Sequence, residues 1–114
     1  STTDYAEAKR QCESIFLAQK SFQVTILRPP FVLGPDDYTN RLNWHIDRIA
    51  NSQPIYFPDI NARLSFLHSD DAGLIISRLI TSQTSYGALN ICSKDPVSLN
   101  EIVSRIENRI RKKA

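Results

Sequence analysis

The sequence predicts an α/β fold. Short β-rich runs alternate along the chain with segments whose apolar residues recur at helical spacing, and this alternation is typical of an α/β domain. The chain has 114 residues, enough for one domain, and its 41% hydrophobic content is that of a globular rather than a disordered protein. The expected order is helix, strand, helix, strand, strand, helix, strand, helix.

The first three elements are predicted from caps and apolar patterning. Asp4 and Glu7 have the spacing of a capping box and predict a helix over residues 4–20. A strand is expected over residues 22–27, where apolar residues lie on both faces, as in a parallel sheet that is covered on both sides. After a proline-rich loop and a turn, a second helix is expected over residues 38–50.

The second half adds strands and two capped helices. Ser69 or Asp70 can cap a strongly apolar helix over residues 72–82. Ser98 and Glu101 form another capping box, which begins the last helix. The strands predicted in this half are residues 54–57, 64–68 and 88–92.

These elements need more cover than a chain of this size supplies. Two strands are apolar on both faces, and several helices are apolar on one face. A chain near this size buries roughly two-thirds of its unfolded surface. We therefore expect further structure to pack on it, in the same polypeptide or from a partner.

Composition excludes several classes of partner. A formal charge of +2 is too small to indicate nucleic acid, and no apolar run approaches the ~20 residues that cross a membrane. Cys12 and Cys92 form no CxxC motif, and together with His45 and His68 they supply no metal cluster. Two free thiols fit a cytoplasmic location. The three glycines are too far apart for a GxGxxG loop or a P-loop, so a phosphate cradle must come from elsewhere.

Tyr5 and Lys9 are the candidate catalytic residues. They are four positions apart at the start of the first helix, so their side chains project from one face. A nearby ammonium favours the phenolate form of a tyrosine, which a tyrosine acid or base requires. Tyrosine and lysine at this spacing are also common surface neighbours, and the pattern by itself leaves both interpretations open. Tyr38, Trp44 and His45 could line a pocket or simply pack.

Five blocks in register resemble one known family. The blocks are residues 5–13 (YAEAKRQCE), 25–35 (TILRPPFVLGP), 66–72 (FLHSDDA), 87–91 (GALNI) and 98–102 (SLNEI). Together they resemble the extended short-chain dehydrogenase/reductases, the NAD-dependent epimerase/dehydratase family, and they cover nearly the whole chain. The resemblance implies the C-terminal part of a Rossmann-like doubly wound fold with a small substrate-binding lobe, lacking the N-terminal dinucleotide-binding half.

The resemblance also implies how the chain is divided and what its parent protein does. Residues 1–114 would form a single incomplete domain. Residues 1–35 would supply the catalytic helix, a strand and the nicotinamide loop, and residues 36–114 the substrate-binding lobe with the last core strand interleaved. The parent would be an NAD- or NADP-dependent oxidoreductase or isomerase acting on a nucleotide sugar or a related alcohol or carbonyl compound. The chain alone would be inactive.

Roles for individual residues follow from the same resemblance. Tyr5 would exchange a proton with the substrate, and Lys9 would bind the nicotinamide ribose and stabilise the Tyr5 phenolate. Asn40 and Arg41 would contact the substrate, although an ordinary polar helix start explains them equally well. The cofactor-facing residues would be Tyr5, Lys9, Pro29, Pro30, Phe31 and Val32.

One position departs from the family pattern. Nucleotide-sugar epimerases commonly carry an arginine two residues before the phenylalanine that corresponds to Phe66. Here Leu64 takes that position, and Arg63 stands one step earlier. A shift of one residue along a strand moves a side chain to the opposite face. The Arg63 guanidinium is therefore expected to point away from the substrate.

Alternatives to an enzyme remain open. The chain could be a non-catalytic module of the same fold that binds a ligand. It could also be an interaction module, because the resemblance implies a homodimer formed through the helix that bears Tyr5. A stable fragment without a function of its own is the third possibility.

Overall fold

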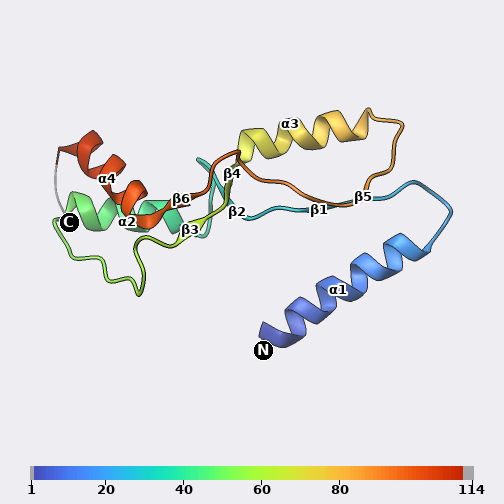
Figure 1. The fold of residues 1–114 in the computed structure, drawn as a ribbon, viewed down its shortest axis with the longest axis horizontal. Helices are drawn as coiled ribbons and strands as arrows, with labels where there is room; N and C mark the ends of the chain where they lie inside the picture. Colours follow the sequence, from blue (N-terminus) through green and yellow to red (C-terminus); the bar gives the residue numbers. More distant parts are fainter. Residues whose placement is uncertain (1, 112–114) are drawn as a thin grey trace.

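The computed structural model describes residues 2–111, and in this range the chain forms four helices and six short strands (Figure 1). The helices are α1 (Thr2–Ala18), α2 (Arg41–Ala50), α3 (Ser69–Ile80) and α4 (Leu99–Ile110). The strands are β1 (Thr25–Arg28), β2 (Phe31–Leu33), β3 (Arg63–Leu64), β4 (Phe66–His68), β5 (Gly87–Asn90) and β6 (Val97–Ser98). Helices and strands alternate, and the predicted α/β class is confirmed.

The strands pair two by two. β1 lies parallel to β5, with Thr25 opposite Gly87 and Arg28 opposite Asn90. β2 lies parallel to β4, whereas the two-residue strands β3 and β6 are antiparallel. Figure 1 shows these pairs in a row, with α3 above β1 and β5 and with α2 and α4 at the far end. Parallel strands are normally covered on both faces, which explains the two-sided apolar pattern of β1.

The start of α1 differs from the prediction. The helix begins at Thr2, so Asp4 lies within its first turn and the predicted Asp4–Glu7 capping box is wrong. Glu7 instead pairs with Arg10 one turn further along, at 2.6 Å. A helix extends upstream of a candidate cap when no Pro or Gly stops it, and none precedes Asp4.

The start of α3 is also earlier than predicted. The helix begins at Ser69, and neither Ser69 nor Asp70 is its N-cap. That position belongs to His68, whose Nδ1 accepts a hydrogen bond from the Asp70 N–H at 3.2 Å. The imidazole nitrogen thus accepts the capping hydrogen bond that an Asn or Asp side-chain oxygen usually accepts.

The strands are shorter than predicted, and one does not form. Residues 54–57 adopt no strand, although their composition favours one. β2 and β6 were not predicted, because each is too short to show an alternating pattern. A strand needs a partner for its backbone groups, and sequence composition does not show where that partner lies.

The last helix begins as predicted. Ser98 Oγ accepts a hydrogen bond from the Glu101 N–H at 3.2 Å, and Glu101 Oε2 accepts one from the Ser98 N–H at 2.7 Å. This complete capping box fixes the direction of α4, which packs against α2. Ser98 is itself buried, so the cap is part of the core.

The core is small and lies beside the α2–α4 contact. Ile49 of α2 is fully buried, and Leu99 of α4 and Leu67 of β4 are nearly so. The radius of gyration is 17.9 Å, whereas a compact domain of this length has one of about 13 Å. None of the helices in the described range is both long and apolar enough to cross a membrane. The elongated shape supports the expectation that further structure covers the chain, which stays a prediction.

Ile49→Ala should lower the free energy of unfolding by about 2–5 kcal/mol, because deleting a buried side chain removes its packing and leaves a cavity. Ile80→Ala removes the same atoms from a side chain that is 77% exposed, and should change stability by less than about 0.5 kcal/mol. Urea denaturation followed by circular dichroism measures both. Equal effects would contradict a core centred on α2.

Candidate functional site

Tyr5 and Lys9 lie one turn apart on α1. The Lys9 ammonium nitrogen is 5.8 Å from the centre of the Tyr5 ring, close enough for a cation–π contact. Both side chains are exposed, and Tyr5 is 70% accessible to solvent. The helix therefore presents the predicted pair on one face, as the spacing indicated. Their catalytic roles stay a prediction.

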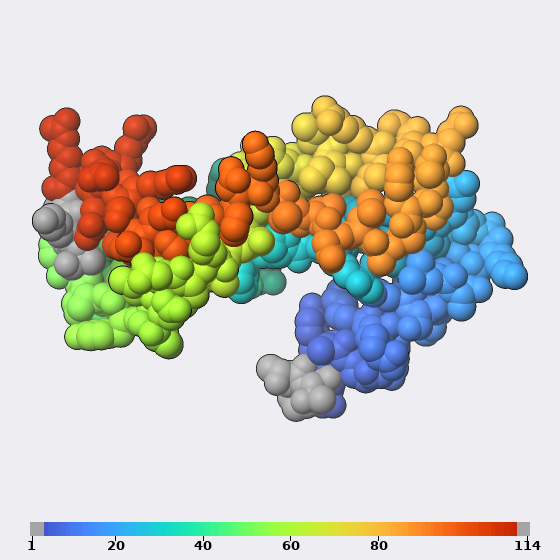
Figure 2. All heavy atoms as spheres, in the orientation of Figure 1, coloured from blue at the N-terminus to red at the C-terminus, as the bar shows by residue number. Residues whose placement is uncertain are grey.

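An ion pair connects α1 to β1. Arg28, the last residue of β1, donates to both carboxylate oxygens of Glu13, with distances of 3.0 Å from Nε and 2.5 Å from Nη2. These hydrogen bonds lower the pKa of Glu13, and the charge of Arg28 adds to the effect. Figure 2 shows α1 in blue, apart from the green and red segments at the other end. The position of the Tyr5 helix thus depends on this bidentate contact.

The predicted nicotinamide loop connects β1 to β2. Pro29 and Pro30 are in neither strand, and Phe31 and Val32 belong to β2. The Phe31 ring packs against Phe66, its partner on β4, with 5.9 Å between ring centres. Val32, on the other face of the strand, lines a separate hollow. That these four residues face a nicotinamide stays a prediction.

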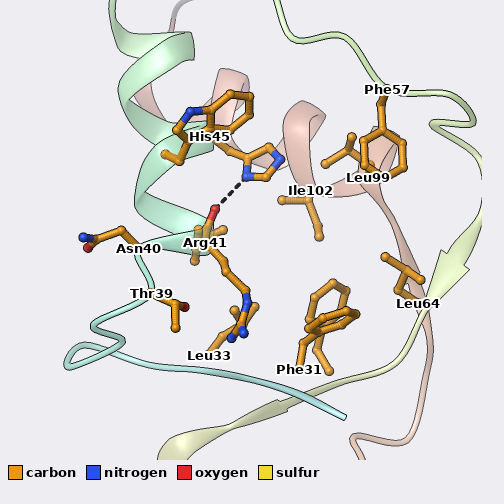
Figure 3. Close-up of a pocket in the computed structure, with 13 residues that line it drawn as sticks. Phe31, Leu33, Thr39, Asn40, Arg41, His45, Phe57, Leu64, Leu99 and Ile102 are labelled. Atoms are coloured by element: carbon orange, nitrogen blue, oxygen red, sulfur yellow. Dashed lines mark hydrogen bonds between the residues drawn. The ribbon is translucent and has the colours of Figure 1, made fainter. Parts of the chain in front are cut away.

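A pocket of about 470 Å³ lies between β2, α2 and α4 (Figure 3). Its walls are mostly apolar side chains, with polar groups contributed by the start of α2. The lining residues are Phe31, Leu33, Thr39, Asn40, Arg41, Leu42, Trp44, His45, Phe57, Leu64, Phe66, Leu99 and Ile102. Volume and lining are those of a small-molecule site. Tyr5 and Lys9 are not among the lining residues.

The predicted substrate residues line this pocket. Asn40 is the N-cap of α2 and has a left-handed backbone, with φ of 52°, which asparagine tolerates better than most residues. The Arg41 guanidinium lies 5.5 Å from the centre of the Phe31 ring. His45 donates from Nδ1 to the Arg41 carbonyl at 2.7 Å, which leaves its Nε2 as an acceptor.

Two of the three aromatic candidates belong to the pocket. Trp44 and His45 line it, and their rings meet edge to face with 4.9 Å between centres. Tyr38 lies before α2, is 92% exposed, and borders the hollow beside Val32 instead. Phe57 and Ile102 were not predicted. The sequence shows only that both are apolar, and they line the pocket because the fold brings their segments beside residues that are far away in the sequence.

The predicted reversal at Arg63 and Leu64 is confirmed. Leu64 lines the pocket, whereas Arg63 does not. Arg63 Nη2 donates to the Pro96 carbonyl at 2.5 Å, and its Nη1 lies 3.5 Å from Glu101 Oε1. The pocket wall is therefore apolar where the family pattern has an arginine.

Asp37 lies close enough to Arg41 to be affected by its charge, but its side-chain hydrogen bond comes from Thr39. Asp37 accepts hydrogen bonds from the hydroxyl and the N–H of Thr39. The hydroxyl lowers the pKa of Asp37 most, burial opposes this shift, and the positive charge of Arg41 contributes a smaller lowering. No ion pair joins Asp37 to Arg41 among the described residues.

The starts of α3 and α4 are poor sites for cofactor phosphates. A helix start binds phosphate when its N–H groups are free and no negative charge is near. α3 begins with Asp70 and Asp71, and the capping box occupies the start of α4. Gly34 serves packing, because a Cβ there would lie 2.0 Å from Ser69 Oγ. In the described range, no three His, Cys, Asp or Glu side chains gather as metal ligands.

Residues 1–92 match the model of the NAD dependent epimerase/dehydratase family. The chain belongs to this family. The matched range includes Tyr5, Lys9, Asn40 and Arg41, as well as the Arg63–Leu64 departure. A search of curated proteins found no match.

Three solved structures are similar to the chain. A UDP-glucose 4-epimerase from Thermotoga maritima, solved with UDP-glucose, is 19% identical with a TM-score of 0.75, over 96% of this chain and 38% of its own. A UDP-N-acetylglucosamine 4-epimerase from Bacillus cereus is 22% identical with a TM-score of 0.74, over 96% and 39%. MoeE5, in complex with UDP-glucose and NAD, is 24% identical with a TM-score of 0.72, over 93% and 37%. They show the epimerase fold, and the chain spans less than two fifths of each.

Glu13→Gln should loosen α1 from β1, because the amide cannot form the charged bidentate contact with Arg28. Spin labels on the exposed native thiols of Cys12 and Cys92 report this as a broader distance distribution between them. Arg28 lowers the pKa of Glu13 below its ordinary 4.5 in the folded chain. The contact is therefore complete above the ordinary value and is lost as the pH falls through the lowered one.

Glu7→Gln is the matched control, because Glu7 contacts Arg10 and Gln11 within α1 and does not connect α1 to the sheet. It should leave the distribution unchanged. If the Glu13 variant were as narrow as the unmodified chain, another contact would hold the helix.

Proposed function

We propose that this chain is the C-terminal catalytic and substrate-binding portion of an NAD- or NADP-dependent epimerase/dehydratase-like oxidoreductase. Its substrate is a nucleotide sugar or a related alcohol or carbonyl compound. Residues 1–35 carry the catalytic helix and the nicotinamide loop, and residues 36–114 the substrate lobe. The observation that carries this proposal is the Tyr5–Lys9 pair, one turn apart on α1, within the range that matches the family. The protein works in the cytoplasm.

The proposed chemistry is proton transfer at Tyr5. Its hydroxyl gives a proton to, or takes one from, the reacting oxygen of the substrate. Lys9 stabilises the phenolate form by its charge and hydrogen-bonds the nicotinamide ribose. A bound nicotinamide supplies or accepts hydride. Tyr5 and Lys9 are both exposed in this chain, so a substrate and a cofactor can reach them.

The pocket between β2 and α2 supplies the substrate end of the proposal. Asn40 and Arg41 border it, and Phe31, a residue of the proposed nicotinamide loop, lines it. The UDP-glucose bound to two of the similar structures supports a small-molecule substrate here. Cofactor phosphates need a glycine-rich turn at a helix start, so the chain alone should not turn over.

Tyr5→Phe should lower kcat by about 100-fold or more in a protein that joins this chain to a dinucleotide-binding half, because it removes the transferable proton. Tyr86→Phe, at a half-exposed tyrosine outside α1, is the matched control and should keep full activity. The rate is followed as NAD(P)H absorbance or as epimerised product. Full activity of the Tyr5 variant, or a NAD-dependent rate from the isolated chain, would contradict the proposal.

Exposed apolar residues on α1 favour a second role in association. Ile15 is 68% exposed, and its neighbours Phe16 and Leu17 are each nearly half exposed. A helix with such side chains in water is stabilised by a partner, and a second copy of this chain supplies a matching helix. This role is compatible with catalysis and independent of it.

Sedimentation velocity should show a dimer or larger species that Ile15→Asp converts to monomer, because a charge on the α1 face opposes burial. Ile80→Asp places the same charge on an exposed isoleucine of α3 and should leave the association intact. A stable monomer of the unmodified chain counts against association, and equal loss in both variants counts against α1 as its surface.

A further inference from the structure

The pocket has one fixed charge on an apolar wall. Among the described residues that line it, Arg41 alone is permanently charged, and most of the remainder are aromatic or aliphatic. In Figure 3 the Arg41 side chain extends from the start of α2 toward Leu33 and Phe31. A ligand that fills this pocket therefore meets a large apolar surface and a single guanidinium.

Aromatic rings form two sides of the pocket. Phe31 and Phe66 pack on each other at the β2–β4 end, and Trp44 and Phe57 contribute from α2 and from the segment before β3. Aromatic faces bind flat ring systems by stacking and by displacing water. A volume of about 470 Å³ has room for two fused or linked rings.

The guanidinium forms no ion pair among the described residues, although its charge adds to the Thr39 hydroxyl in lowering the pKa of Asp37. It lies over the Phe31 ring, and Asp37 takes its hydrogen bonds from Thr39 and from the Arg41 backbone N–H. Arg41 is exposed and forms no ion pair in the described range, so its guanidinium can pair with one anionic group of a ligand. His45 lines another part of the same pocket, and with Nδ1 donating to the Arg41 carbonyl, the Nε2 of a neutral imidazole can accept a hydrogen bond from a ligand hydroxyl.

Among the described residues, no second cation lines the pocket. Leu64 faces the cavity, and Arg63 is turned away to the Pro96 carbonyl and Glu101. A diphosphate carries at least two negative charges, and burying one of them against Leu64 leaves it without a partner. The wall thus disfavours a diphosphate and accepts a ring or an alkyl group.

We propose that this pocket binds a ring-bearing compound with a single anionic group, whose rings lie against Phe31 and Trp44 and whose anion pairs with Arg41. Such ligands are aryl or alicyclic carboxylates and their monoanionic equivalents. That this ligand is also the substrate rests on the proposed function, and it selects the alcohol or carbonyl class over the nucleotide sugars. The binding preference itself needs no cofactor.

The single tryptophan of the chain makes the pocket observable. In ¹⁵N–¹H correlation spectra, the indole N–H of Trp44 is one resolved signal, and its shift can be titrated with biphenyl-4-carboxylate, biphenyl-4-carboxamide and UDP-glucose. The carboxylate should bind about tenfold more tightly than the isosteric neutral amide, because it alone forms a charged pair with Arg41. It should exceed UDP-glucose by a similar factor.

Two variants separate the charge from the shape of the pocket. Arg41→Gln should make the carboxylate and the amide bind equally, whereas Arg78→Gln, on α3 and outside the pocket, should not. Leu64→Arg should raise the affinity for UDP-glucose by adding the missing cation. If that variant loses its dispersed spectrum, the comparison of the Arg41 and Arg78 variants decides.

Equal binding of the carboxylate and amide to the unmodified chain, tighter binding of UDP-glucose, or an indole signal that none of the three compounds moves would overturn the proposal. The Tyr5→Phe activity assay tests the proposed function independently of this binding experiment. Binding of the carboxylate with a fully active Tyr5 variant leaves this pocket in place and refutes the catalytic role. Loss of activity in that variant with no selectivity for the carboxylate does the reverse.

Discussion

The parallel pairing of β2 with β4 is the constraint on which the pocket depends. It sets Phe31 opposite Phe66 and so joins two segments that are far apart in the sequence. β2 leads into the turn before α2, and β4 continues directly into α3 through the His68 cap. The β3–β6 pair, one residue before β4, then brings the start of α4 against the same cavity. Without the β2–β4 pairing, Phe31, Phe66 and Leu64 would no longer be positioned around one cavity, and the ring under Arg41 would be displaced.

The chain divides its chemistry between two places. The proposed proton-transfer pair, Tyr5 and Lys9, lies on α1, which a bidentate ion pair connects to the end of β1. The pocket lies beyond the two prolines that follow Arg28, and the rigid Pro29–Pro30 step separates them. The two prolines restrict the backbone between β1 and β2, but the side chains of α1 are almost all exposed, so packing contributes little to its position. The pocket is lined by several elements of this chain, whereas α1, the proposed catalytic helix, is the part that gains most from additional structure.

Sequence motifs predicted an element correctly where the contacts that form it lie within a few residues of one another. The Ser98–Glu101 box begins α4 because both hydrogen bonds lie within four residues. The Asp4–Glu7 pair has the same spacing but does not mark the start of α1, because the helix begins upstream at Thr2. Composition favoured a strand at residues 54–57, which pair with no other strand in the described range. It gave no sign of β6, which pairs with β3. Pairing between distant segments decides both, and no window of sequence contains it.

The same limit explains the site. Helical spacing placed Tyr5 beside Lys9, and strand alternation placed Leu64 and Arg63 on opposite sides, because both rules act within one element. Phe57 and Ile102 come from other elements and carry no signal beyond being apolar. The Arg63–Leu64 order is nevertheless the most informative of the local observations. Because Leu64 and Arg63 lie in this order, leucine lines the cavity and the positive charge of Arg63 lies beside the Glu101 carboxylate. A pocket can thus change its preferred ligand charge while the backbone, the register and the family resemblance stay the same.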